Sequence, residues 1–207
     1  MFKDRQDAGV QLAKKLSSYR GQDAVILALP RGGVVIGYEV AKALKLPLDI
    51  IVVRKVGYPG DPEYAICAVD EKGTLLCDQE ADTIDRQWLQ KEIERQRQEA
   101  LRRLGAYRGN RKPIGVAGKI AIVVDDGIAT GLTMRLAVRA LAAQHPKKII
   151  IAVPVAPELQ RTLMREGADE VIVLEPPEEF WGAVGAHYES FEQVTDSEVI
   201  SLLRARD

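Results

Sequence analysis

The residues with the clearest potential for chemistry are two adjacent acids, Asp125 and Asp126, and the small, hydroxylated loop at 127–133. Backbone N–H groups in such a loop, together with the N-terminus of a following helix, can bind a phosphate. Two neighbouring carboxylates can accept hydrogen bonds from a pair of hydroxyls or hold a hydrated metal ion. A phosphate site beside a hydroxyl site predicts a ligand such as ribose 5-phosphate.

The segments on either side of this loop predict how it is positioned. Residues 120–124 form an apolar run that predicts a buried parallel strand. Residues 134–143 have helix-forming composition, with apolar side chains spaced for one buried face. The acids and the loop therefore stand at a strand-to-helix junction.

This order of residues resembles the signature of the type I phosphoribosyltransferases, which is an apolar strand, two acids, a short variable stretch, Thr-Gly, one variable residue and Thr. The fixed positions are filled by Asp125, Asp126, Thr130, Gly131 and Thr133. The resemblance implies that the acids contact the ribose hydroxyls of phosphoribosyl pyrophosphate. It also implies that the 5-phosphate is bound by Gly127, Ile128, Ala129, Thr130, Gly131, Leu132 and Thr133. The alternative is an ordinary turn with a capped helix.

A second glycine-containing turn, Pro30, Arg31, Gly32 and Gly33, follows the apolar run 24–29. Two glycines, a cation and a helix N-terminus suit a diphosphate. The glycine spacing matches neither the P-loop nor the dinucleotide fingerprint. In the resembling family a loop at this place binds pyrophosphate; the alternative is a tight turn.

Two further cations, Arg54 and Lys55, follow the apolar run 48–53 and open a Gly- and Pro-rich stretch. We predict that 54–63 is a loop. The resemblance implies a basic residue here that stabilises the departing pyrophosphate, and a mobile loop that closes over the site. The alternative is a pair of solvated cations.

Apolar runs alternate with helical patterns along the chain and predict a doubly wound α/β fold. We expect a mainly parallel five-stranded sheet, flanked by helices, with a hairpin at 66–77 and a small C-terminal hood. The predicted strands are 24–29, 48–53, 120–124, 148–153 and 170–174, and the predicted helices are 4–18, 34–44, 83–104, 134–143, 157–166 and one from about 196. Thr195 and Glu198 predict a capping box for the last helix. Loops after parallel strands converge at a topological switch point, where ligands bind.

We interpret residues 1–207 as one domain with a core at about 20–175 and a hood at about 176–207, with or without the N-terminal helix. In the resembling family a hood covers the acceptor base. Trp181 and Tyr188 are candidates to pack against a planar base, and a small satellite core is the alternative. His187 is expected to be a packed or surface histidine and not a catalyst.

Composition narrows the class of protein. A net charge of −1 gives no general attraction to nucleic acid, so the arginine-rich stretch 95–112 is read as a solvated helix face, with RNA binding as the alternative. No apolar run is long enough to span a membrane, and the polar first residues predict no signal peptide. We expect a cytoplasmic protein. Its two cysteines, Cys67 and Cys77, are expected to make neither a disulfide framework nor a zinc site and to be buried as small apolar residues.

The implied reaction moves ribose 5-phosphate from phosphoribosyl pyrophosphate to a nucleobase or similar nitrogen acceptor, releasing pyrophosphate with Mg²⁺ as the cofactor. No protein ligand of the ion is assigned directly. Family members that use 6-oxopurines carry an acid where this chain has Ala129, so the sequence does not identify the acceptor base. A homodimer is possible on the sequence, and the oligomeric state is not assigned. The alternative function is a non-catalytic regulatory protein that binds phosphoribosyl pyrophosphate.

Overall fold

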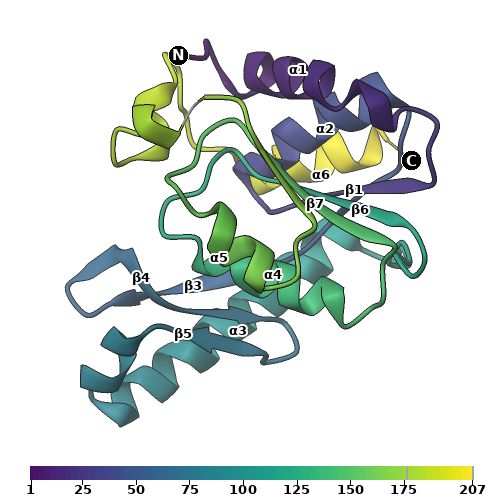
Figure 1. The fold of residues 1–207 in the computed structure, drawn as a ribbon. Coiled ribbons are helices and arrows are strands. Elements are labelled where there is room, and N and C mark those ends of the chain that lie inside the picture. The colour runs from purple at the N-terminus through teal and green to yellow at the C-terminus, as the bar shows by residue number, and fades with distance from the viewer. Residues whose placement is uncertain (176, 207) are drawn as a thin grey trace.

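The computed structural model describes residues 1–175 and 177–206. Its centre is a parallel five-stranded sheet in the order β2-β1-β6-β7-β8 (Figure 1). The strands are β1 (Ala24–Ala28), β2 (Leu48–Ile50), β6 (Ile120–Val124), β7 (Lys148–Val153) and β8 (Glu170–Val173). All five predicted strands are confirmed, although β2 is shorter than 48–53 because the chain enters a second sheet at Val53.

Helices cover both faces of this sheet, as a doubly wound fold requires. They are α1 (Arg5–Lys15), α2 (Gly32–Leu44), α3 (Arg86–Arg108), α4 (Leu132–Ala142), α5 (Gln160–Arg165) and α6 (Asp196–Arg204). The side chain of Asp85 caps α3 by accepting from the Trp88 N–H, so α3 begins later than predicted. The predicted capping box of Thr195 and Glu198 on α6 is confirmed.

The predicted start of α5 at 157 is wrong, because residues 157–159 are not helical. Leu159 packs against the turn at Gly131, where an added β-carbon would lie 2.8 Å from its Cδ1 atom. This contact keeps the segment before α5 beside the loop that follows β6.

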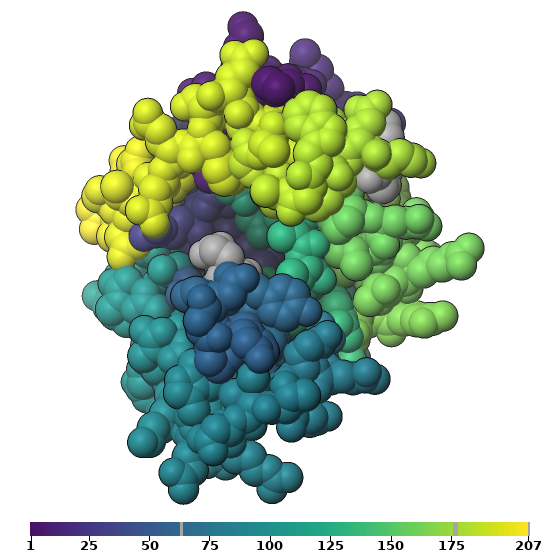
Figure 2. Space-filling model, turned by 90° about the vertical axis from the view of Figure 1, so that its left-hand side faces the viewer, coloured from purple at the N-terminus to yellow at the C-terminus, as the bar shows by residue number. Residues whose placement is uncertain are grey.

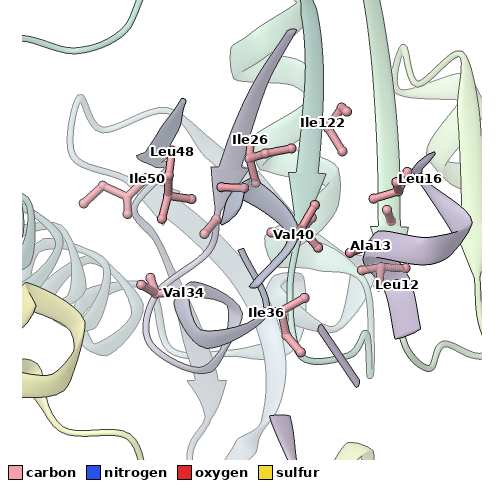
Figure 3. Close-up of a cluster of buried hydrophobic side chains, with 14 of the residues drawn as sticks. Leu12, Ala13, Leu16, Ile26, Val34, Ile36, Val40, Leu48, Ile50 and Ile122 are labelled. Atoms are coloured by element: carbon pink, nitrogen blue, oxygen red, sulfur yellow. The ribbon is translucent and has the colours of Figure 1, made fainter. Parts of the chain in front are cut away.

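Alternate residues of each strand enter two separate cores, because successive strand side chains point to opposite faces. Ile122 and Val124 pack with residues of α1, α2 and α6, whereas Ala121 and Val123 pack with residues of α4 and α5. Figure 3 shows the first core, where side chains from the two N-terminal helices meet the sheet; its labelled residues are Leu12, Ala13, Leu16, Ile26, Val34, Ile36, Val40, Leu48, Ile50 and Ile122. Each large side chain buried here contributes roughly 1.5–3 kcal/mol to folding.

A second, antiparallel sheet contains β3 (Val53–Tyr58), β4 (Asp61–Asp70) and β5 (Leu75–Cys77). The prediction of a loop at 54–63 is therefore wrong. Val53 and Val56 are buried and pair with β4, and the Gly- and Pro-rich residues serve as a short turn with Gly60 at φ 89°. The predicted hairpin at 66–77 is confirmed, with Gly73 at φ 88° in its turn.

The expectation that the two cysteines are only small apolar residues of the core is also wrong. Cys67 on β4 and Cys77 on β5 are directly opposite each other and form a disulfide, with Cα atoms 4.0 Å apart. Close opposition of this kind arises where antiparallel strands bring two side chains together. The disulfide therefore joins two adjacent strands of the smaller sheet.

The first residues of the chain lie against the segment that follows the last strand of the large sheet. Phe2 pairs with Tyr188, so the N-terminal residues run beside the C-terminal segment, residues 177–206. α6 packs against α2 and α3. Among the described residues, none of the helices combines the length and apolar character of a membrane span.

Candidate active site between strands β1 and β6

The candidate site lies at the switch point of the large sheet. The chain passes from β1 outward to β2, and from the neighbouring β6 in the other direction to β7. The Leu29 N–H donates to the Val124 carbonyl at 3.0 Å, which holds the two strand ends together. The predicted pyrophosphate loop and the acid pair therefore leave adjacent strands side by side, where ligands of such folds bind.

The turn at Gly32 and Gly33 touches the acid pair directly. A β-carbon added at Gly32 would lie 1.9 Å from Asp126 Oδ2, and one added at Gly33 would lie 2.9 Å from Asp125 Oδ1. A side chain at either position would displace the acids, so glycine is required by this close approach. The Pro30–Arg31 peptide before them is cis.

The acid pair is partly buried and internally hydrogen-bonded. The Asp126 N–H donates to Asp125 Oδ1 at 2.8 Å. Burial raises the pKa of Asp125 well above its usual range, and the neighbouring Asp126 carboxylate raises it further. Asp126 Oδ2 accepts from Arg5 Nε at 2.7 Å, and the Asp126 carbonyl accepts from the Tyr188 hydroxyl at 2.6 Å. Asp125 therefore holds its proton to higher pH than an isolated aspartate does.

The predicted phosphate loop packs into the core at some positions and is exposed to solvent at others. Ile128 and Leu132 are buried, whereas Ala129 and Thr130 are exposed. Gly131, at φ 85°, is the N-cap residue before α4, and the first-turn N–H groups of that helix have no partner within it. The loop lies against the C-terminal segment, because a β-carbon at Gly127 would be 2.5 Å from Val184. Exposed hydroxyl and backbone donors of this kind suit a phosphate.

Arginines lie near one another on the turn after β1, on β3 and on α3. Arg31, in the turn after β1, forms an ion pair with Asp196 of α6 at 3.6 Å. Arg54 Nε, on β3, donates to Gln96 Oε1 of α3 at 3.1 Å. Burial lowers the pKa of Arg54, and nearby Arg103 and Arg31 lower it further. Convergence of like charges favours an anionic ligand that would neutralise them.

Arg54 and Lys55 also line a cleft of about 330 Å³ between the β3–β4 hairpin and α3. Figure 2 shows this face of the molecule hollowed between the blue hairpin below and the yellow-green C-terminal segment above. Both predicted cations therefore lie on the hairpin side of the site, opposite the C-terminal segment.

The two aromatic candidates for base packing have different surroundings. Tyr188 is buried, and its ring packs against Phe2 and Phe191 at centroid distances of 5.5 and 4.9 Å. Trp181 is 61% exposed and stacks on His187 at 5.0 Å. His187 is a packed histidine, as expected, with Nδ1 2.5 Å from Glu175 Oε2. Of the two candidates, Trp181 keeps more of its ring open to solvent.

Two residues near the site, Arg5 and Asp196, had no role in the sequence interpretation. Arg5 pairs with Asp126, and Asp196 accepts from the Tyr107 hydroxyl at 2.6 Å while pairing with Arg31. Asp196 lies in the first turn of α6, where acids are ordinary, and Arg5 is the first residue of α1. No local pattern in the sequence distinguishes them.

Comparison with known proteins agrees with this geometry. A family model described as the phosphoribosyl transferase domain matches residues 4–190. Two curated proteins from different strains of Mycobacterium tuberculosis, each named "Putative phosphoribosyl transferase", are 40% identical over 206 residues, which is 98% of this chain and 46% of theirs. The chain thus spans about half the length of the curated relatives it matches.

One solved structure is similar over nearly its whole length. The crystal structure of TT1426 from Thermus thermophilus is 40% identical, with a TM-score of 0.78 over 99% of this chain and 98% of that chain. The family match covers the acid pair, the phosphate loop and the Gly32–Gly33 turn. The chain therefore belongs to the phosphoribosyl transferase domain family.

Proposed function

We propose that this chain is a phosphoribosyltransferase domain. It transfers ribose 5-phosphate from phosphoribosyl pyrophosphate to a nitrogen of a nucleobase or similar acceptor and releases pyrophosphate. The observation that carries the proposal is the contact between the Gly32–Gly33 turn and the acid pair. A turn suited to a diphosphate and acids suited to ribose hydroxyls then lie within the length of one ligand.

The phosphate loop and the acids hold the sugar. Loop N–H groups and the Thr130 and Thr133 hydroxyls bind the 5-phosphate. Asp125 and Asp126 accept from the ribose hydroxyls, and their negative charge favours the positive charge that develops on the ring. The ring is thereby fixed with its C1 atom toward the cationic side of the site.

The pyrophosphate leaves C1 with the electron pair of the broken C–O bond. The acceptor nitrogen supplies the pair for the new C–N bond, and its proton passes to the departing pyrophosphate or to water. Gly32 and Gly33 N–H groups, with Arg31, Arg54 and Lys55, stabilise the charge on the leaving group. Closure of the β3–β4 hairpin over the acid pair and the Gly32–Gly33 turn excludes water and limits hydrolysis.

Mg²⁺ fits the chemistry of the site, because Asp125 and Asp126 offer the oxygen donors that this ion prefers. Within residues 1–175 and 177–206, no group of three or more acids, histidines or cysteines could hold a metal. We therefore assign most of the ion's ligands to pyrophosphate, ribose and water. When bound, the ion supplies positive charge to the leaving group.

The acceptor side of the site is assigned to the C-terminal segment as a hood. Trp181 is the candidate to pack against a planar base, because its ring is exposed. Tyr188, whose ring is buried, contributes through its hydroxyl on the Asp126 carbonyl. Ala129 supplies no acid beside the base, so the acceptor is left as a nucleobase or similar amine.

A regulatory protein without catalysis is less well supported. Its best candidate surface is the arginine-rich face of α3, where Arg95, Arg97 and Arg102 pair with Glu92, Glu94 and Glu99 at 2.6, 2.8 and 2.7 Å. These local pairs neutralise much of the charge that a nucleic acid would need.

The test is pyrophosphate release from phosphoribosyl pyrophosphate and Mg²⁺ across a panel of purine and pyrimidine bases. An Asp125→Asn, Asp126→Asn double variant is the blank, and Asp23→Asn, at an exposed acid of a surface ion pair, is the control for loss of a carboxylate. Release that depends on one acceptor and is absent from the blank supports the enzyme. Ligand binding by calorimetry without release from any acceptor contradicts the transferase and favours the regulatory function.

A further inference from the structure

Asp126 is held from three directions. Its carboxylate accepts from Arg5 Nε at 2.7 Å, its carbonyl accepts from the Tyr188 hydroxyl at 2.6 Å, and its N–H donates to Asp125 at 2.8 Å. On the remaining side, the Gly32 turn comes so close that no β-carbon would fit. The carboxylate therefore has one defined place, and Arg5 is the cation that faces it.

Arg5 is itself fixed by the C-terminal segment. Its guanidinium lies over the Phe191 ring at 3.7 Å from the centroid, and Nη1 donates to the Glu192 carbonyl at 2.7 Å. The side chain is 12% exposed. Phe191 in turn packs on Gly185, where an added β-carbon would lie 2.9 Å from Cδ1 of the ring. A planar, five-donor guanidinium can make the stacked and hydrogen-bonded contacts together, which an ammonium cannot.

Arg5 also balances charge at the acids. Asp125 and Asp126 are adjacent carboxylates, and the guanidinium Nε of Arg5 lies 2.7 Å from Asp126 Oδ2. Opposite charges this close attract each other more strongly where they are partly buried than in water.

We infer that Arg5 is a positioning residue of the ribose subsite: it fixes the Asp126 carboxylate against the Gly32 turn, balances the charge of the acid pair and ties both to the C-terminal segment. This inference rests on the proposed function, because it takes the acid pair as the ribose-binding group. It adds that the affinity for phosphoribosyl pyrophosphate depends on α1 and on residues 191–192, neither of which belongs to the signature.

The test compares Arg5→Gln and Arg5→Lys with Arg108→Gln. Arg108 pairs with Asp49 at 3.0 Å with similar burial and has no contact with the acids, so it controls for loss of a partly buried ion pair. Calorimetry with phosphoribosyl pyrophosphate and Mg²⁺ measures the affinity of each variant. We expect Arg5→Gln to weaken binding at least about tenfold, because the Asp126 carboxylate loses the donor that holds it beside the Gly32 turn.

Arg5→Lys keeps the charge but loses the contacts to Phe191 and Glu192, so its affinity should fall between those of the wild type and Arg5→Gln. Arg108→Gln should lower thermal stability and leave affinity unchanged. Equal affinity of Arg5→Gln and wild type would overturn the inference. So would equal losses in Arg5→Gln and Arg108→Gln.

A measurement without ligand separates this inference from the proposed function. The backbone amide shifts of Gly32 and Asp126 in NMR spectra report how the carboxylate and the turn lie against each other. Arg5→Gln should move both resonances, and Arg108→Gln should leave them near the wild type. If the wild type failed to bind phosphoribosyl pyrophosphate, the proposed function would fail, while these shifts would still decide the role of Arg5 at the acids. Unchanged shifts in Arg5→Gln would overturn the inference.

Discussion

Gly32 and Asp126 constrain each other, because a β-carbon at position 32 would lie 1.9 Å from a carboxylate oxygen that Arg5 holds in place. Gly32→Ala should therefore displace Asp126 or open the turn, at a cost of about 1–3 kcal/mol in unfolding free energy. Affinity for phosphoribosyl pyrophosphate should fall with it. Denaturant unfolding and calorimetry measure the two effects.

Gly105→Ala is the matched control for that substitution. Gly105 lies within α3, and an added β-carbon there would meet nothing within 4 Å. Alanine at such a position should stabilise the helix by up to about 1 kcal/mol and leave binding unchanged. Equal behaviour of the two variants would show that the close approach at Gly32 has no energetic consequence.

Because burial raises the pKa of Asp125, the free energy of unfolding should depend on pH. The folded protein binds this proton more tightly than the unfolded chain, so stability declines as pH rises from about 3.9, the ordinary aspartate value, to the folded pKa. Asp125→Asn removes that decline. We expect its thermal midpoint to exceed that of the wild type at pH 8 and to match it near pH 4.

Asp196 supplies the opposite case. Its hydrogen bond from the Tyr107 hydroxyl, followed by that from Arg102, lowers its pKa, so its contribution to stability is present above the ordinary pKa and is lost as pH falls. Asp196→Asn should lower the midpoint at pH 8. A lower midpoint for both variants at pH 8 would contradict the assignment of Asp125.

At the scale of elements, the five strands of the large sheet were predictable because each is a short apolar run buried on both faces. The β3–β4 hairpin was not, because Gly57, Gly60 and Pro62 gave the segment the composition of a loop. Gly57 sits where β4 approaches closely, since an added β-carbon would lie 2.5 Å from the Pro62 carbonyl oxygen. A glycine required by strand contact and one required by a turn look the same in a sequence.

The disulfide is a property of paired strands, and the ten-residue separation of Cys67 and Cys77 did not predict it. Closing a loop of this length stabilises a fold by roughly 2–3 kcal/mol in the chain-entropy model. A Cys67→Ser, Cys77→Ser double variant should lose up to that amount in denaturant unfolding and keep its affinity for phosphoribosyl pyrophosphate. A reducing agent should lower the stability of the wild type and leave the double variant unchanged.

If the reducing agent had no effect on the wild type, the two thiols would not be bonded in solution. The result also bears on the predicted cytoplasmic location, because stable disulfides are uncommon in the reducing cytosol of most cells.

At the scale of the whole molecule, the site is assembled from segments far apart in the chain. Arg5 forms an ion pair with Asp126, and Arg31 forms one with Asp196. The signature at 125–133 could be identified in the sequence because its residues are close together and follow the order of residue types found in the family. The contacts of Arg5 and Asp196 could not, because they depend on where the two chain ends fold back onto the sheet.

This assembly predicts which segments a ligand orders. Binding at 100 times the dissociation constant stabilises the folded state by about 2.7 kcal/mol. Because the proposed ligand touches the β3–β4 hairpin, the phosphate loop and the C-terminal segment together, hydrogen exchange should slow at 54–62, 127–133 and 185–192 when phosphoribosyl pyrophosphate and Mg²⁺ are added. The turn at 71–74 between β4 and β5 contains none of the proposed ligand-binding residues and should exchange at the same rate. Protection confined to 127–133 would mean that the ligand binds the phosphate loop alone and that the hairpin and the C-terminal segment do not close on it.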